Sequence, residues 1–301
     1  MLLSVVIPVY HGSITIQKLI ESVQEELNNF SFEIVLINDG SKDDSEKVCL
    51  ELSDKFNNIS FLSLRKNFGE FQAVMCGLNH AKGDYSVIID DDFQNPPSEI
   101  VKLLETAQKS NFDVVYGQYE EKKHHQFRNF GSWLVNQITT SLFQKPQDLY
   151  LSSFKLIKRE VVEEICNYKG PYPYIDGLIF NVTDNVGKVK VQHDNRHNGE
   201  SNYTSKKLAS LFLNIIFGYS LLPVRLSLFL GFLSTLIAIL LTLLPLFTDF
   251  NHPVGLIVLF VGGVQLISIG IVGEYVGKTF LTQSNTPQYT LKIKKINNAE
   301  Q

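Results

Sequence analysis

Cysteine is scarce in this sequence, and its cysteines form no recognisable motif. Cys49, Cys76 and Cys166 are widely separated, with no CxxC pair and no histidine at ligand spacing. This spacing argues against a structural zinc site. We predict that the three cysteines are small buried residues of a protein kept in a reducing compartment.

The sequence also lacks an excess of basic residues. It holds 27 Lys and Arg against 31 Asp and Glu, which gives a net charge of −4. A protein that binds a nucleic-acid backbone needs a basic surface to neutralise the phosphates. We therefore expect no nucleic-acid partner.

The N-terminus lacks the features of a signal peptide. The first residues, MLLSVVIPVY, have no basic n-region, and Pro8 interrupts the apolar run. We interpret this segment as the first buried strand.

Apolar β-rich runs alternate with segments of helical spacing through the first third of the chain. The predicted strands are Leu2 to Val9, Glu33 to Ile37, Ile59 to Leu64 and Tyr85 to Ile89, and the predicted helices are Ile14 to Leu27, Ser45 to Phe56 and Phe71 to His80. Such alternation predicts an α/β domain with a parallel sheet and helices on both faces.

Ligands of such sheets bind beyond the carboxyl ends of the strands. The segments expected there are Tyr10 to Ser13, Asn38 to Asp43, Lys66 to Gly69 and Asp90 to Pro97. A second polar stretch, from about Tyr116 to Asn202, mixes strand and helix patterns and carries several basic residues. We interpret it as the second half of the same domain.

Two long uncharged runs follow the polar part of the chain. Leu226 to Phe247 and Val254 to Gly273 contain no charged residue, and each is long enough to cross a hydrocarbon core, which takes about 20 residues of helix. A buried hairpin of a soluble core is the alternative. We predict a cytoplasmic catalytic domain over residues 1–203, an amphipathic helix over 204–225, a transmembrane hairpin over 226–277 and a cytoplasmic tail over 278–301.

Basic residues flank this hairpin on both sides, whereas the connecting loop has no Lys or Arg. By the positive-inside rule, both termini and the catalytic domain face the cytoplasm, as in a multi-pass protein of the inner membrane. The helix over residues 204–225 has an apolar face behind Lys206 and Lys207. It either lies in the membrane interface or packs on the catalytic domain.

Three adjacent carboxylates follow the strand that ends at Ile89. In an extended chain alternate residues point the same way, so Asp90 and Asp92 can converge on one cation while Asp91 turns aside. Carboxylates select hard cations, which predicts Mg²⁺ or Mn²⁺ bridging a diphosphate. A solvated acidic turn is the alternative, and the position at a strand end favours the metal site.

The order of motifs resembles the family 2 polyprenyl-phosphate glycosyltransferases, relatives of dolichyl-phosphate mannose synthase. The resemblance covers nearly the whole chain and depends on SVVIPVY, INDGSKD, RKNFGEFQAVMCG, DDDFQNPP, NGESNY and two spans ending in GEYVGK. It implies an inverting enzyme with the glycosyltransferase A-type, Rossmann-like fold. The donor would be a nucleotide-sugar, with UDP favoured by the resemblance, and the acceptor a polyprenyl phosphate.

The resemblance also implies roles for individual residues. Asp90 and Asp92 match the metal-binding DxD, and Gln94 matches a glutamine near the metal and the phosphates. Asp39 matches the acid that contacts the nucleotide base, and Pro8 and Tyr10 match the loop over the nucleoside. The residues matched to positions that face phosphate are Arg128, Arg196 and Ser201.

The chain departs from the family pattern at three places. His11-Gly12 replaces an Asn-Glu, and Asn202 stands where a lysine is common. The segment Tyr150 to Leu156 replaces Asp-x-Gly-Asp-Phe-Arg-Leu and so lacks the usual candidate base. Asp148 or Asp176 could take its place.

The leading hypothesis is transfer of a hexose or amino-hexose from a UDP-sugar to a polyprenyl phosphate. One alternative is a membrane glycosyltransferase with a glycan acceptor, and another is an inactive membrane scaffold. The sequence leaves open whether the chain forms a homo-oligomer.

Overall fold

The computed structural model describes residues 1–119, 140, 142–143, 145–192, 194, 216–217, 220–243, 254–284 and 286–297. The chain divides into two compact units. One comprises residues 1–202 together with 287–301, and the other comprises residues 203–286.

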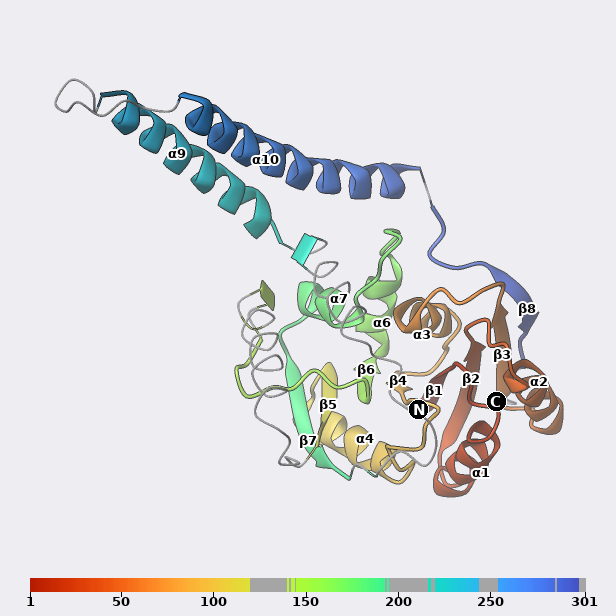
Figure 1. The fold of residues 1–301 in the computed structure, drawn as a ribbon. Helices are drawn as coiled ribbons and strands as arrows, with labels where there is room; N and C mark the ends of the chain where they lie inside the picture. The colour runs from red at the N-terminus through yellow and green to blue at the C-terminus, as the bar shows by residue number, and fades with distance from the viewer. Residues whose placement is uncertain are drawn as a thin grey trace. The chain divides into compact units, whose positions relative to one another are not determined.

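The first unit is built on an eight-stranded mixed sheet with the strand order β7-β5-β6-β4-β1-β2-β3-β8 (Figure 1). Its strands are β1 (Leu2–Val9), β2 (Ser31–Asn38), β3 (Ile59–Leu64), β4 (Tyr85–Ile88), β5 (Val114–Tyr119), β6 (Lys155–Lys158), β7 (Val186–Val191) and β8 (Leu291–Lys295). The expected α/β class is confirmed. The sheet is mixed rather than all parallel, because β6 runs antiparallel to β4 and β5, and β8 antiparallel to β3.

The central strands read as nearly continuous apolar runs because both of their faces are covered. Leu3, Val5 and Ile7 of β1 are fully buried in one core, and Val6 is fully buried on the other face, where it packs near Gly77. The helices that cover the first face are α1 (Ile16–Glu26), α2 (Ser45–Lys55) and α4 (Glu99–Ser110). The helix packed on the second face of β1 and β2 is α3 (Glu70–Leu78).

Two further helices complete the described part of this unit. They are α6 (Arg159–Cys166), which packs on β6 and β4, and α7 (Ile175–Val182), which packs on α6. The predicted strands Leu2 to Val9 and Ile59 to Leu64 have the observed bounds, and the other strands and helices predicted for the first third of the chain differ from the observed ones by one or two residues at one or both ends.

The C-terminal segment joins the sheet of the first unit. Residues 291–295 form β8 on the outer edge of β3, with Lys294 opposite Leu62. The sequence predicted a separate tail from residue 278. Instead, residues 278–283 continue the last long helix, and the residues from 287 onward belong to the first unit.

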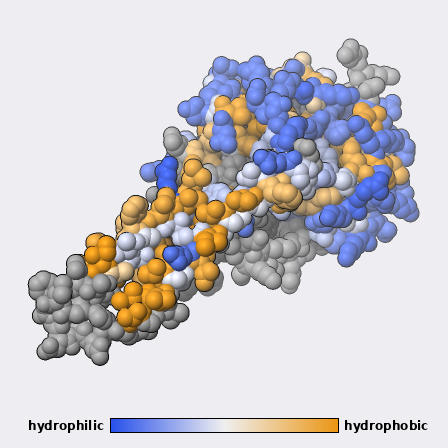
Figure 2. All heavy atoms as spheres, turned by 90° about the horizontal axis from the view of Figure 1, so that it is seen from above, coloured by the Kyte–Doolittle hydropathy of each residue, from blue (hydrophilic) through white to orange (hydrophobic). Residues whose placement is uncertain are grey.

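The second unit contains two long apolar helices, α9 (Leu222–Leu243) and α10 (Val254–Gln283), which pack side by side (Figure 1). Both are long and apolar enough to cross a membrane. Their apolar side chains lie on the surface, as the band of hydrophobic atoms in Figure 2 shows. A soluble core hairpin would be mostly buried, whereas the apolar windows of these helices are 11% and 0% buried. The alternative of a buried hairpin therefore does not fit.

Candidate active site

The candidate site lies where the parallel strands β4, β1 and β2 end at the same edge of the sheet. The main chains of these ends are bonded to one another: Asp39 N donates to Val9 O at 2.9 Å, and Ile89 N donates to Val6 O at 3.1 Å. The loops after β1, β2 and β4 therefore start side by side, as ligand-binding loops of open α/β sheets do.

The three aspartates after β4 have different partners. Asp90 Oδ2 accepts a hydrogen bond from Ser153 Oγ at 2.6 Å, and Asp91 Oδ2 accepts one from Tyr10 N at 3.0 Å. Asp92 Oδ1 accepts one from Gln94 N at 3.1 Å. Asp91 thus ties the β1 loop to the acidic loop.

The backbone of the acidic loop turns sharply after these residues. Phe93 has φ 62°, a left-handed conformation that costs a non-glycine residue of order 1 kcal/mol or more and clusters at functional sites. His11 in the neighbouring β1 loop has φ 57°. The two loops that carry candidate ligands therefore both contain strained residues.

The electrostatics around Asp90 disfavour its charged form. Desolvation by the surrounding protein, followed by repulsion from Glu70 and from the other aspartates, raises the pKa of Asp90 to about 8, although the bond from Ser153 acts in the opposite direction. A cation bound beside this carboxylate would remove the penalty.

The donor set fits a divalent cation that takes part of its coordination from a substrate. Among the described residues, no three His, Cys, Asp or Glu side chains form a group that could hold an ion. Mg²⁺ is commonly held by one or two carboxylates together with substrate phosphates. Asp90 and Asp92, with their mutual repulsion, are suited to that arrangement.

The predicted nucleotide-binding residues lie in the same group of loops. Asp39 is 3% exposed, and its two carboxylate oxygens accept hydrogen bonds from Phe68 N at 2.7 Å and Gly69 N at 2.9 Å. Burial, its largest influence, raises the pKa of Asp39, and the two backbone bonds oppose it. The observed contacts show Asp39 holding the loop between β3 and α3, while its contact with a base stays a prediction.

The loop after β2 passes so close to the loop after β3 that position 40 requires glycine. This residue has φ 60°, and a Cβ there would lie 2.3 Å from the backbone carbon of Lys66. No other residue type fits without moving the β3 loop.

The remaining candidates in the β1 loop and the acidic loop are partly exposed. Pro8 is a partly exposed residue of β1, and the ring of Tyr10 stacks on His11 at 4.1 Å. Gln94 Nε2 donates to Asp194 O at 3.4 Å, which brings residue 194 beside the acidic loop. The nucleoside and phosphate contacts predicted for these residues remain predictions.

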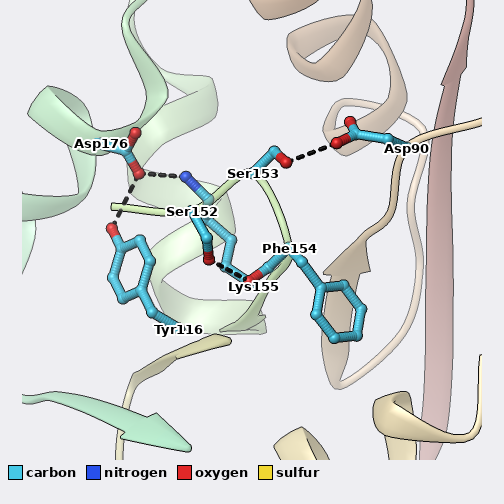
Figure 3. Close-up of polar contacts among 7 residues, drawn as sticks. All are labelled: Asp90, Tyr116, Ser152, Ser153, Phe154, Lys155 and Asp176. Carbon is cyan, nitrogen blue, oxygen red and sulfur yellow. Dashed lines mark hydrogen bonds and ion pairs between the residues drawn. The ribbon is translucent and has the colours of Figure 1, made fainter. Parts of the chain in front are cut away.

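The two candidate bases are both paired with lysines. Asp176 is 5% exposed and accepts hydrogen bonds from Tyr116 Oη at 3.0 Å and from Lys155 Nζ. Asp148 is exposed and pairs with Lys188, whose hydrogen bond holds the pKa of that carboxyl below its usual value. Asp176 and Asp90 lie on opposite sides of the segment Ser152 to Phe154 (Figure 3).

Ser153 was not among the predicted site residues. It occupies the position at which the family pattern has an aspartate, so the departure from the motif was a signal that could have found it. Arg128, Arg196 and Ser201 lie outside the described residues, as does most of the predicted helix over 204–225. Their phosphate-binding and interfacial roles stay predictions.

The sheet, the strand-end acidic loop and the apolar helices that follow are those expected of a membrane-associated A-type glycosyltransferase. Residues 4–166 match the family described as Glycosyl transferase family 2. This match covers more than half of the 301 residues. The chain therefore belongs to glycosyltransferase family 2.

Similar proteins align with the chain from end to end. A bactoprenol glucosyl transferase of Shigella phage SfX is 31% identical, and the alignment covers 98% of this chain and 100% of that protein. An undecaprenyl-phosphate 4-deoxy-4-formamido-L-arabinose transferase of Proteus mirabilis is 27% identical, over 96% of this chain and 92% of that protein.

Among solved structures, the fold is similar to glucosyl-3-phosphoglycerate synthase from Mycobacterium tuberculosis, in a complex with Mn²⁺, UDP and glucosyl-3-phosphoglycerate. The TM-score is 0.53 at 18% identity, over 71% of this chain and 77% of that one. This likeness confirms the A-type fold.

Proposed function

We propose that this chain transfers a sugar from a nucleotide-sugar, UDP-hexose or UDP-amino-hexose, to a polyprenyl phosphate at the cytoplasmic face of the membrane. The observation that carries the proposal is the end-to-end similarity to a bactoprenol glucosyl transferase. Because the alignment includes both apolar helices as well as the sheet, it supports a lipid acceptor rather than a soluble one.

Two groups of residues prepare the donor in this proposal. Asp39 and Gly40 hold the nucleoside loops, while Asp90 and Asp92 would hold Mg²⁺ or Mn²⁺, whose positive charge would stabilise a diphosphate leaving group. The Mn²⁺ and UDP in the structure of similar fold support this choice of cation and nucleotide.

The acceptor needs little activation by the protein. In an inverting displacement, a phosphate oxygen of the lipid attacks the anomeric carbon, and the bond from that carbon to the β-phosphate oxygen breaks with its electron pair leaving on UDP. A phosphate monoester with a second pKa of about 6 is already largely anionic at neutral pH. A base at position 153 is therefore unnecessary, and Ser153 is compatible with activity.

The difficulty lies in bringing two anions together. Arginines form charge-assisted and often bidentate bonds with phosphate, and Arg128 and Arg196 are proposed for that task. Holding the partners in line would then supply much of the rate enhancement.

A transfer assay with extraction tests the proposal. The full-length protein, purified in detergent, is given radiolabelled UDP-sugars, undecaprenyl phosphate and MnCl₂, and the label should move into the organic phase and be lost with EDTA. Label that appears on an added glycan would instead support a glycan acceptor. Absence of both transfer and UDP release for every sugar tested would support an inactive scaffold.

A further inference from the structure

Ser153 links the acidic loop to the segment that precedes β6. Its hydroxyl donates to Asp90 Oδ2 at 2.6 Å, and the hydroxyl of Tyr119 hydrogen-bonds with the side chains of both Ser153 and Asn95. Ser153 thus stands between a candidate metal ligand and a tyrosine at the end of β5.

The residues on either side of Ser153 are firmly held. Ser152 Oγ donates to Phe154 O at 2.8 Å, and Gly117 N donates to the same oxygen at 3.0 Å. The ring of Phe154 is fully buried, and the backbone around Ser153 is therefore fixed between β5 and β6.

A buried ion pair anchors the next residue. Lys155 is 3% exposed and bonds to Asp176, which Tyr116 also contacts. In Figure 3 these three side chains point toward one another on one side of the segment, while Ser153 points to Asp90 on the other. With Lys155 held on one side of the segment, the Ser153 side chain faces the acidic loop on the other.

Such an arrangement orients a carboxylate. A hydrogen bond to Oδ2 fixes the rotation of the Asp90 side chain and leaves Oδ1 available to another partner. Groups that hydrogen-bond a metal ligand orient it, and their loss commonly weakens metal binding by 10- to 100-fold.

We propose that Ser153 is a positioning residue for Asp90, whose carboxylate it would orient for a divalent cation. The inference rests on the proposed function, because it assumes that Asp90 is a cation ligand. Position 153, where the family pattern has an aspartate, would thus contribute to cation affinity rather than to proton transfer.

Mn²⁺ binding measures this role without any sugar transfer. Free Mn²⁺ is followed by electron paramagnetic resonance as it is titrated into the full-length protein in detergent with UDP. Ser153→Ala should weaken Mn²⁺ binding about 10-fold, and Ser153→Thr, which keeps the hydroxyl, should bind as the wild type does. In transfer assays, the alanine variant should need more Mn²⁺ for half-maximal rate, with a smaller change in kcat at saturation.

Ser86→Ala is the matched control. Ser86 lies on β4, four residues before Asp90, and its buried hydroxyl has no hydrogen-bond partner among the described residues. Ser86→Ala removes a hydroxyl group, as Ser153→Ala does, but breaks no hydrogen bond of the described residues, so Mn²⁺ binding should not change.

The outcomes separate this inference from the proposed function. If Asp90→Asn loses Mn²⁺ binding and Ser153→Ala does not, the positioning role is wrong and the metal site stands. If the wild type and Asp90→Asn bind Mn²⁺ equally, both the metal site at Asp90 and the positioning role of Ser153 are wrong. A Ser153→Ala variant that melts earlier, with threonine giving no rescue of Mn²⁺ affinity, would show a structural role and overturn the inference. If Ser153→Ala weakens Mn²⁺ binding but the wild-type protein transfers no sugar, the positioning role stands and the proposed function is wrong.

Discussion

At the residue scale, three adjacent aspartates have three different partners. Asp90 bonds to a serine side chain, Asp91 to the backbone of the β1 loop, and Asp92 to the backbone of its own loop. Three identical side chains next to one another in the sequence therefore have different hydrogen-bond partners, and we expect substitution by asparagine to affect them differently.

We expect Asp90→Asn and Asp92→Asn each to lower kcat by roughly 100-fold or more, the usual scale for loss of electrostatic stabilisation. Asp91→Asn should be much milder, because its amide oxygen can still accept the bond from Tyr10 N. Sugar transfer at saturating Mn²⁺ measures the effect, with thermal melting as the check on folding. Equal losses at all three positions would contradict separate roles.

Asp176 offers a second test at this scale. Replacing one partner of a buried ion pair leaves an unpaired buried charge, so Asp176→Asn should lower the free energy of unfolding by about 3 kcal/mol. Denaturant or thermal melting of the detergent-solubilised protein measures this. A variant that melts like the wild type but loses kcat would instead identify Asp176 as the catalytic base.

At the element scale, β8 covers the outer edge of the sheet. Besides its pairing with β3, Lys292 lies 2.7 Å from Glu46, and Lys295 pairs with Asp54, both on α2. Asn297 continues the contact, because its Nδ2 donates to Ser53 O at 2.8 Å.

Truncation tests the contribution of β8. A chain ending at Thr286 should melt earlier and aggregate, because the β3 edge would expose unpaired backbone groups. A chain ending at Asn297 keeps every described contact of β8 and serves as the control. Size-exclusion chromatography and thermal melting report the outcome, and identical behaviour of the two truncations would show that the edge needs no cover.

His80, just beyond the end of α3, gives stability a dependence on pH. Its Nδ1 lies 2.8 Å from Cys76 O. Burial is the largest influence that lowers the pKa of His80, and repulsion from Lys294 of β8 adds to it. The folded protein therefore binds this proton more weakly than the unfolded chain, so the stability from neutral His80 is present above about pH 6.5 and is lost as the pH falls below it.

We expect Tm to fall more between pH 7.5 and pH 5.5 in the wild type than in His80→Gln, which cannot titrate. Groups common to both proteins cancel in this comparison. A Gln variant with the same or a larger fall would show that His80 does not contribute.

At the scale of the whole molecule, the chain leaves the catalytic unit before the two apolar helices and returns to it afterwards. Residues 1–202 and 287–301 belong to one unit, joined through β8 and β3. If both helices cross the membrane, the two ends of the hairpin must lie on the same side, since one folded sheet cannot occupy both. This supports the proposal that both ends of the hairpin lie on one side, independently of the charge pattern, which predicts that this side is the cytoplasm.

Reporter fusions test this arrangement. A reporter after Gln301 should be active on the cytoplasmic side, and one inserted at Asn251 should be active outside. If the two reporters are active on the sides opposite to those expected, the orientation is the reverse of the proposed one. If both are active on the same side, the two helices do not form a spanning hairpin.

Elements with a strong local pattern could be predicted from the sequence. The strand at Ile59 to Leu64, and the acidic loop that follows the strand from Tyr85, could be recognised from neighbouring residues alone, because burial gives the residues of one segment a regular apolar pattern. The two long apolar helices were predictable for the same reason. The sequence by itself thus determined the α/β class, the two long apolar helices and the strand ends at which the candidate site lies.

Contacts between distant segments were decided by the tertiary structure. The bond from Ser153 to Asp90 and the pairing of Lys155 with Asp176 join residues on separate elements, and β8 joins a strand more than two hundred residues earlier. The local sequence pattern does not show which distant segments contact each other, because these contacts depend on the strand order and the packing of the whole sheet. Which aspartate bonds to Ser153, which is paired with Lys155, and which edge the last strand covers were therefore settled by the fold.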